Sequence, residues 1–322
     1  LSVGRVEGYR TFGTKLWDAA RFAQVTGCVP DPDVDPAGVG ERVNQWIVGE
    51  TARLCETAQA ALEGYRFNDY AGALYAHVWG VYCDWYLELS KPLLQGEDAG
   101  ATRETQATAA WALDQILKLM HPVSPFITEE LWSVTGGAAG RPGPLALEAW
   151  PRLSAAALAT PEADAEMGWV VQLIETVRSV KAELNAPPSA QAPLTLVGAG
   201  PELAARVARN RALIDRLARL SALDFADAPP KGAVTAPIEG ATLALALADV
   251  IDVSAEKTRL EKALAKLGKE AEGLEKKLSN DAFLAKAPED VVAEQRERLA
   301  AAQADAQKLQ AAVARLKELE EA

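Results

Sequence analysis

Apolar residues recur every three or four positions over most of the first 150 residues, which is the spacing of one face of a helix. Segments rich in glycine and proline separate these blocks, as is typical of connections between helices. In the block Ala73–Leu94, apolar and aromatic residues fill every face, so we expect this helix in the middle of a bundle. The pattern predicts helices near Tyr9–Val25, Val39–Glu63, Phe67–Lys91, Ala101–His121 and Thr128–Val134.

Between about residues 160 and 253 the pattern alternates between helical and strand-like segments. Helical spacing over Ala165–Leu184 and Pro201–Leu220 is followed in each case by short runs that are typical of strands. The strand-like runs are "PLTLVG", "ALDFAD", "AVTAPI" and "ATLALALADVID". This alternation predicts a small α/β domain.

From Ser254 to the end, leucine and alanine recur in alternating steps of three and four, as in the a and d positions of heptads. The segment "KLSNDAFLAKAPEDVV" interrupts the pattern. We therefore expect an antiparallel coiled-coil hairpin with arms roughly 40–50 Å long. Phe283 and Leu284 at its tip either pack against the hairpin end or contact a partner.

These patterns predict a mainly α fold in three parts: a helical bundle over residues 1–150, a small α/β domain over 160–253 and a coiled-coil arm over 254–322. Hydrophobic content of 49% and charged content of 24% are ordinary for a globular protein. No apolar run is long enough to predict a membrane span. The first residues lack an initiator Met and the features of a signal peptide, so we expect a piece of a longer chain.

The composition narrows the kind of function. A net charge of −12 argues against indiscriminate binding to nucleic acid, although a local basic face could still bind phosphates. Cys28, Cys55 and Cys83 are widely spaced, which favours reduced thiols in the cytoplasm over disulfides or a zinc site. We expect structural roles for His77 and His121, and the sequence offers no convincing catalytic or metal-binding constellation.

Trp46 follows Arg42, Asn44 and Gln45 at the start of a predicted helix. An aromatic plane beside amides and a guanidinium can hold an unstacked base through stacking, edge hydrogen bonds and a phosphate contact. Core packing of Trp46 is the alternative, and we expect core positions for Trp79, Trp85 and Trp111. In the hairpin, the basic residues near the tip either contact phosphates or belong to a solvated face with i,i+4 ion pairs.

Several long motifs, in order, resemble those of a known family. "GYRTFGTKLWDAARF", "FNDYAGALYAHVWGVYCDWYLELSKPLL" and "HPVSPFITEELW" are similar to the anticodon-binding helical domain of class I aminoacyl-tRNA synthetases. "CDWYLELSKP", "VRSVKAELNAPPSA" and "KLSNDAFLAKAPEDVVAEQRERL" together resemble the valyl-tRNA synthetase family within that class. The resemblance covers essentially the whole chain. The first part of the expected fold would then be an anticodon-binding helix bundle and the last a tRNA-binding arm.

The resemblance implies a parent enzyme that ligates L-valine to valine tRNA with ATP and Mg²⁺. The family's HIGH and KMSKS motifs are missing here, so this fragment is expected to hold no cofactor and to be inactive alone. Its expected partners are valine tRNA and the missing N-terminal catalytic and editing domains of the same chain. A cytoplasmic monomer that does not bind membranes is expected.

The resemblance also implies two sets of site residues. The anticodon-binding set is Lys15, Trp17, Arg21, Arg42, Asn44, Gln45 and Trp46. The family more often has Asp-Arg-aromatic where this chain has Asn44-Gln45-Trp46, so the aromatic position agrees with the family pattern and the two polar positions depart from it. The set at the outer corner of the tRNA, where the D- and T-loops meet, is Lys276, Lys277, Phe283, Leu284, Lys286, Arg296 and Arg298. The alternative function is a structural coiled-coil adaptor that mediates protein–protein association.

Overall fold

The computed structural model describes residues 3–248, 250–280 and 288–320. It divides into two compact units, residues 1–171 and 172–322, each with its own apolar core. The expected fold class is confirmed: the chain is mainly helical, with a small mixed sheet and a C-terminal helical hairpin. The division into three domains, at 1–150, 160–253 and 254–322, stays a prediction.

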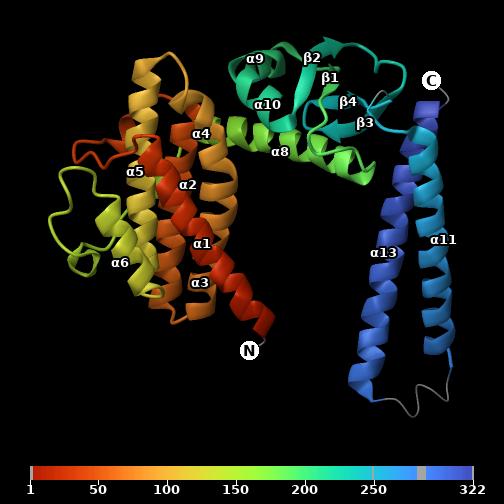
Figure 1. Ribbon diagram of the computed structural model, residues 1–322, viewed down its shortest axis with the longest axis horizontal. Coiled ribbons are helices and arrows are strands. Elements are labelled where there is room, and N and C mark those ends of the chain that lie inside the picture. Colours follow the sequence, from red (N-terminus) through yellow and green to blue (C-terminus); the bar gives the residue numbers. More distant parts are fainter. Residues whose placement is uncertain (1–2, 249, 281–287, 321–322) are drawn as a thin grey trace. The chain divides into compact units, whose positions relative to one another are not determined.

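The first unit is a bundle of helices, and the helical blocks expected from periodicity are found with ends shifted by a few residues (Figure 1). Short 3-10 or helical turns lie in the connections: η1 (Pro36–Gly38), η3 (Leu145–Leu147) and α7 (Ala155–Leu158). The main elements are α1 (Val3–Val25), α2 (Arg42–Glu63), α3 (Phe67–Ala76), η2 (His77–Tyr86), α4 (Leu87–Leu94), α5 (Ala99–Met120) and α6 (Pro125–Val134).

The helix from α3 through η2 to α4 runs without a break, and its middle part, η2, is a π-helix. Three tyrosines of this helix are fully buried, and each donates its hydroxyl proton to an acceptor in the bundle. Tyr70 donates to the Leu119 carbonyl, Tyr82 to the Ala109 carbonyl at 3.1 Å, and Tyr86 to an amide oxygen in α2 at 3.1 Å. Burial raises the pKa of Tyr70 to about 12, so these hydroxyls stay donors. One face of this helix is therefore buried in the bundle, whereas Tyr75 is 40% exposed, so the expected burial on every face is not found.

The second unit contains a four-stranded sheet of order β2-β1-β4-β3. β1 (Ala192–Val197) is parallel to β2 (Leu220–Ala226) and antiparallel to β4 (Ala241–Ala246), and β3 (Ala233–Ile238) is antiparallel to β4. α9 (Pro201–Arg209) and α10 (Arg211–Ala218) form the crossover that a parallel strand pair requires. β3 coincides with the strand-like run "AVTAPI".

α8 (Pro161–Glu183) is joined to the sheet end by a buried lysine. The Lys181 Nζ donates to the carbonyl oxygens of Ala190 at 3.0 Å, Ala218 at 3.0 Å and Arg219 at 2.9 Å. Burial lowers the pKa of Lys181, and the three carbonyls satisfy the three N–H bonds of the ammonium. The Lys181 side chain thus holds the segments that lead into β1 and β2 against α8.

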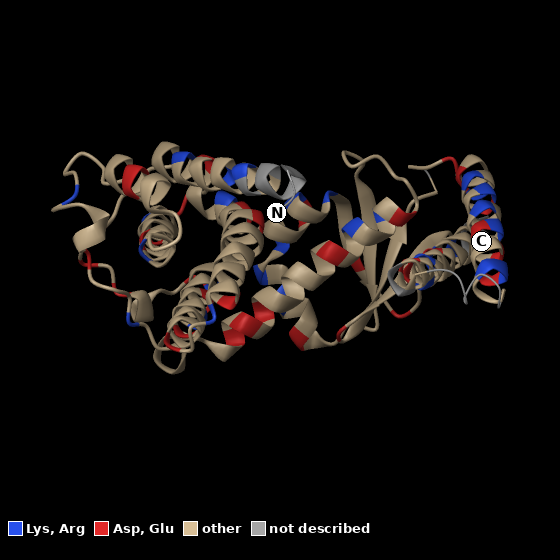
Figure 2. Cartoon of the chain, turned by 90° about the horizontal axis from the view of Figure 1, so that it is seen from below, with Lys and Arg blue, Asp and Glu red and all other residues tan. Residues whose placement is uncertain are grey.

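The hairpin consists of α11 (Val253–Leu278) and α13 (Glu289–Glu320), which pack along each other. Asp252 caps α11 by accepting from the Ala255 N–H at 2.9 Å. Lys and Arg are interspersed with Asp and Glu along both helices (Figure 2). Among the hairpin residues whose burial is described, the buried apolar ones are Leu260, Leu274, Ala302, Ala312, Val313 and Leu316. Residues 281–287, at the predicted tip, lie outside the described residues.

The base of the hairpin belongs to the core of the second unit. α13 packs on β3, and Arg315 of α13 forms an ion pair with Glu183 at the end of α8. Leu260 and Leu316 near this base are fully buried. The arm is therefore an extension of the α/β core at one end and solvated at the other.

Candidate functional site

The exposed surface of α1 contains two of the predicted anticodon residues one turn apart. Trp17 is 42% exposed and Arg21 is also exposed. Their spacing of four residues places them on the same side of the helix. An exposed indole beside a guanidinium can provide a stacking surface and a phosphate contact together. These two residues form the most accessible part of the predicted set.

Lys15 lies on a different side of α1. Its Nζ forms an ion pair with Asp84 and lies 4.0 Å from the centre of the Trp79 ring. Both contacts are with η2, and positions two residues apart on a helix do not face each other. The structure therefore separates Lys15 from Trp17 and Arg21.

A column of aromatic rings that the sequence did not indicate lies beside Lys15. The ring centres of Phe12 and Tyr75 are 4.9 Å apart and those of Tyr75 and Trp79 are 5.7 Å apart, both pairs being stacked. Tyr75 is 40% exposed, so the column reaches the surface of the bundle. The i,i+4 spacing of Tyr75 and Trp79 was the signal that could have indicated this column.

Asn44, predicted to contact a base edge, is fully buried at the start of α2. Its Nδ2 donates to Glu104 Oε1 at 2.8 Å and to Thr105 Oγ1 at 3.0 Å, and its Oδ1 accepts from the Tyr86 hydroxyl at 3.1 Å. These contacts use both N–H bonds of the amide and one acceptor position. The difference from the expected exposed position arises because α5 and η2 cover this side of α2. In this structure the amide joins three helices.

The other residues at the start of α2 are also engaged within the protein. Arg42 Nη1 donates to Gln45 Oε1 at 2.9 Å, and Gln45 Nε2 donates to the Val39 carbonyl at 3.0 Å. Trp46 is only 8% exposed, which matches the core-packing alternative more closely than an open stacking platform. Arg42 and Gln45 are half-buried, so Arg42 keeps N–H groups that can reach a phosphate. Contact of Asn44, Gln45 and Trp46 with bases stays a prediction.

Glu104 of α5 does the capping that α2 lacks at its own N-terminus. Its carboxylate accepts from the N–H groups of Gly40 and Glu41, both at 2.9 Å, as well as from Asn44. The N-cap residue Glu41 makes no capping bond with its side chain. A carboxylate here satisfies orphan donors and interacts favourably with the helix dipole.

Replacing Glu104 with alanine should lower the free energy of unfolding of the bundle by about 2 kcal/mol, because two N–H groups and a buried amide lose their acceptor. Chemical denaturation followed by circular dichroism measures this change. Glu104→Gln is the matched control, since it keeps one acceptor oxygen and should recover part of the loss. Equal stability of the alanine variant and the unchanged chain would contradict the capping role.

The described basic residues of the arm lie on its surface. Lys276, Lys277, Arg296 and Arg298 are exposed. Lys277 Nζ donates to the buried Gln295 Oε1 at 3.2 Å, and Arg298 pairs with Glu270 at 3.2 Å. Exposed pairs of this kind contribute little to stability, so they can exchange for phosphate contacts. Phe283, Leu284 and Lys286 lie outside the described residues.

In the part of the chain that the structure describes, the cysteine and histidine side chains give little support for a catalytic role. Burial raises the pKa of the Cys28 and Cys55 thiols, and burial also lowers the pKa of His77 to about 4. His121 Nδ1 is 2.9 Å from Thr128 Oγ1, a contact between α5 and α6. Within residues 3–248, 250–280 and 288–320, no group of three His, Cys, Asp or Glu side chains could hold a metal.

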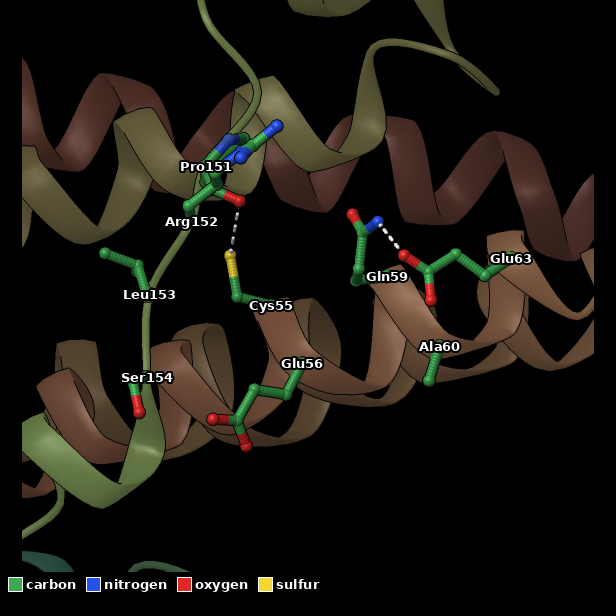
Figure 3. A pocket seen from close by; sticks show the side chains of 9 residues that line it. All are labelled: Cys55, Glu56, Gln59, Ala60, Glu63, Pro151, Arg152, Leu153 and Ser154. Carbon is green, nitrogen blue, oxygen red and sulfur yellow. Dashed lines mark hydrogen bonds between the residues drawn. The ribbon is translucent and has the colours of Figure 1, made fainter.

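The hollow beside Cys55 is a further surface feature of the bundle (Figure 3). The thiol points to the Pro151 carbonyl, with Sγ 3.6 Å from the oxygen, and Gln59 Nε2 donates to Glu63 Oε1 at 2.5 Å. Glu56 also has a partner, because its Oε1 accepts from the Ala155 N–H at 2.8 Å. Four of the polar side chains at the wall thus already have partners inside the protein.

None of the helices among the described residues is both long enough and apolar enough to cross a membrane.

Comparison with known proteins agrees with the two regions described above. Residues 44–196 match the family model "Anticodon-binding domain of tRNA ligase", and residues 252–317 match "Valyl tRNA synthetase tRNA binding arm". Neither matched model describes a protein-association adaptor.

The chain is similar along nearly all its length to curated proteins named valine–tRNA ligase. It is 53% identical to the one from Caulobacter vibrioides, with 98% of this chain and 35% of that protein covered. It is 49% identical to the one from Ruegeria pomeroyi, with 99% and 31% covered. It is 46% identical to the one from Bradyrhizobium diazoefficiens, with 99% and 36% covered. The chain thus spans about a third of the length of these relatives.

Proposed function

Because this chain belongs to the valyl-tRNA synthetase family, we propose that it recognises the tRNA on behalf of a parent valine–tRNA ligase. The observation that carries the proposal is the presence, in one chain, of an anticodon-binding domain and a tRNA-binding arm. The two regions would bind two separate parts of one tRNA, which increases affinity and selectivity together.

The bundle is proposed to bind the anticodon at the end where α1 finishes and α2 begins. Trp17 offers an exposed aromatic surface, and Arg21 and Arg42 offer guanidinium groups to phosphates. Trp46 is buried, and stacking on a base would require its ring to become more exposed. We therefore assign primary contact to Trp17, Arg21 and Arg42, with Lys15, Asn44, Gln45 and Trp46 in support.

The arm is proposed to contact the outer corner of the tRNA through Lys276, Lys277, Arg296 and Arg298, together with Phe283, Leu284 and Lys286 at its tip. On a chain whose net charge is −12, these four exposed cations, which alternate with acidic side chains along the hairpin, are proposed as the surface that contacts phosphates. Such a surface provides affinity that depends on salt and does not depend on sequence. Selection for one tRNA would then come from the bundle.

The parent enzyme is proposed to ligate L-valine to valine tRNA with ATP and Mg²⁺, using parts that lie outside this chain. The alignment with only about a third of each relative supports this division of labour. Under this proposal the chain binds no cofactor and is inactive alone, and the parent acts as a cytoplasmic monomer. The adaptor function has no observation in its favour.

A binding titration with labelled valine tRNA tests the recognition proposal. Affinity should fall as salt rises, and Arg21→Ala should weaken binding several-fold and reduce the salt slope by about one unit. Arg66→Ala is the matched control, because Arg66 is an exposed arginine that pairs with Asp69 and follows the end of α2 opposite to Arg42. A changed anticodon should also weaken binding.

The proposal would be wrong if valine tRNA and an unrelated tRNA bound equally at physiological salt. Equal losses in Arg21→Ala and Arg66→Ala would contradict the assignment of the anticodon surface while leaving tRNA binding itself intact.

A further inference from the structure

A hollow of about 320 Å³ lies between the last turns of α8 and the end of α10, two helices that lie side by side (Figure 1). Three basic side chains line it: Arg178 and Lys181 from α8 and Arg219 at the end of α10. The other lining residues are apolar: Ala182, Ala186, Pro188, Leu217 and Ala218. We name this feature the α8–α10 hollow, and its composition favours an anionic group.

The carboxylates near the hollow along α8 and α10 have other partners or positions. Glu183 of α8 pairs with Arg315 of α13, and Asp215 of α10 pairs with Arg211 at 2.7 Å. Glu175 of α8 is exposed and does not line the hollow. The hollow therefore has three positive charges at its wall and, among the residues that the structure describes, no negative one.

Arg178 is held at the wall by the end of α10. Its Nε and Nη2 both donate to the Leu217 carbonyl, at 3.1 Å and 3.0 Å, while the residue stays exposed. A guanidinium is planar, so two bonds to one carbonyl fix the direction of the whole group. A guanidinium that is oriented in advance loses less conformational entropy when it binds a phosphate.

Lys181 contributes charge to the hollow and not a hydrogen bond, because three carbonyl oxygens already accept its N–H bonds. Burial lowers the pKa of Lys181, and the nearby Arg219 guanidinium lowers it further. An anion in the hollow would offset this repulsion between two cations. The electrostatic environment of Lys181 thus favours binding of a negative charge.

Arg219 has a backbone conformation that is rare for a residue with a side chain. Its φ of 50° and ψ of 63° lie in the left-handed region, at the point where α10 ends. Glycine or asparagine normally occupies this position. The side chain is exposed, and its guanidinium forms no hydrogen bond or ion pair with another described residue. Because such backbone strain is concentrated at functional sites, an arginine here favours a role for the guanidinium.

We propose that the α8–α10 hollow binds a backbone phosphate of the tRNA, with Arg178 and Arg219 as the hydrogen-bond donors and Lys181 as an additional charge. Arg219 lies in the sequence between the two regions, 44–196 and 252–317, whose matched family models are named for tRNA ligase and tRNA binding. A tRNA bound by both regions carries a phosphate at every nucleotide, which favours a phosphate over a carboxylate of a polypeptide. This inference rests on the proposed function and adds a third contact to it.

A binding titration with valine tRNA tests the inference on the 322-residue chain. Arg219→Asn removes the cation and suits the left-handed conformation, so the variant should unfold at the same temperature as the unchanged chain. It should bind valine tRNA several-fold more weakly, with a salt slope reduced by about one unit. The preference for valine tRNA over a tRNA with a changed anticodon should stay the same, because phosphate contacts do not read sequence. Arg219→Lys keeps the charge and should retain the salt slope.

Arg216→Ala is the matched control, because Arg216 is an exposed arginine of α10 that does not line the hollow. Its salt slope should equal that of the unchanged chain. Phosphate-ethylation interference then locates the contact on the tRNA. At one phosphate, ethylation should weaken binding to the unchanged chain and have no effect on binding to Arg219→Asn.

Equal affinity of Arg219→Asn and the unchanged chain would overturn this inference while leaving tRNA recognition intact, and so would equal losses in Arg219→Asn and Arg216→Ala. Arg219→Gly suits the same backbone conformation and must reproduce the loss; a loss in only one of the two variants would also overturn the inference. Absence of tRNA binding by the unchanged chain would instead contradict the proposed function, and this inference with it.

Discussion

Replacing Arg141 with methionine should lower the free energy of unfolding of the bundle by about 3–5 kcal/mol, since it leaves a buried carboxylate without its partner. Arg141 forms a two-pronged ion pair with Asp114, with both N···O distances 2.7 Å. The two side chains are only 8% and 14% exposed. The guanidinium also donates to the Trp132 carbonyl at 2.9 Å and lies 3.7 Å from the centre of the Trp132 ring.

Urea denaturation of the Arg141→Met variant measures the loss, and a double-mutant cycle gives its cause. Asp114→Leu combined with Arg141→Met removes both charges, so the double variant should be much more stable than Arg141→Met alone. Arg141→Lys keeps the charge but loses the two-pronged geometry of the guanidinium. Its stability should lie between that of Arg141→Met and that of the unchanged chain. A loss below about 1 kcal/mol in Arg141→Met would indicate an ordinary surface pair instead.

Most secondary structure of this chain could be predicted because hydrophobic periodicity is a local property. Helix α2 ends at Glu63 and β3 covers Ala233–Ile238, both as expected. The ion pair of Arg141 with Asp114 could not be predicted, because nothing local relates an arginine in the glycine-rich connection after α6 to a carboxylate in α5. The same holds for Glu104 and the N-terminus of α2.

The tryptophans show where periodicity fails. We expected Trp79, Trp85 and Trp111 in the core, and the structure corrects this, since all three are half-buried while Trp46 is buried. Trp79 and Trp85 lie in η2, whose i→i+5 hydrogen bonds change which residues share a face. Trp46, which lies in the first turns of α2, is only 8% exposed. Both differences depend on tertiary packing.

The contacts at the base of the arm are the part of the second unit that the sequence did not indicate. Heptads predict a hairpin but do not show what its ends contact. Leu260 and Leu316 are fully buried near the base, where α13 packs on β3 and Arg315 pairs with Glu183. The distal arm is a solvated surface, whereas the proximal arm belongs to a core.

Deleting residues 254–322 should therefore prevent cooperative folding of the α/β part. Losing a single fully buried leucine costs about 2–5 kcal/mol, and this deletion removes Leu260 and Leu316 together. Domains are stable by only about 5–15 kcal/mol, so the remainder should unfold or become molten. Loss of a cooperative urea transition and of dispersed amide resonances from residues 172–253 would record this result.

The matched control replaces residues 267–304 with a short glycine-containing turn. With the Lys277–Gln295 contact as the register of the two antiparallel helices, Lys266 and Asp305 lie about opposite each other, so a short turn can join them. This shortened hairpin keeps Leu260, Leu316 and Arg315, so the α/β part should still fold cooperatively. It removes Lys276, Lys277, Arg296 and Arg298, so both deletions should weaken tRNA binding and reduce its salt dependence.

A full deletion that unfolds at the same urea concentration as the control would show that the arm is separable. A shortened hairpin that binds tRNA with unchanged affinity would remove the distal arm from the proposed interface, because the protein would be folded and the basic residues absent.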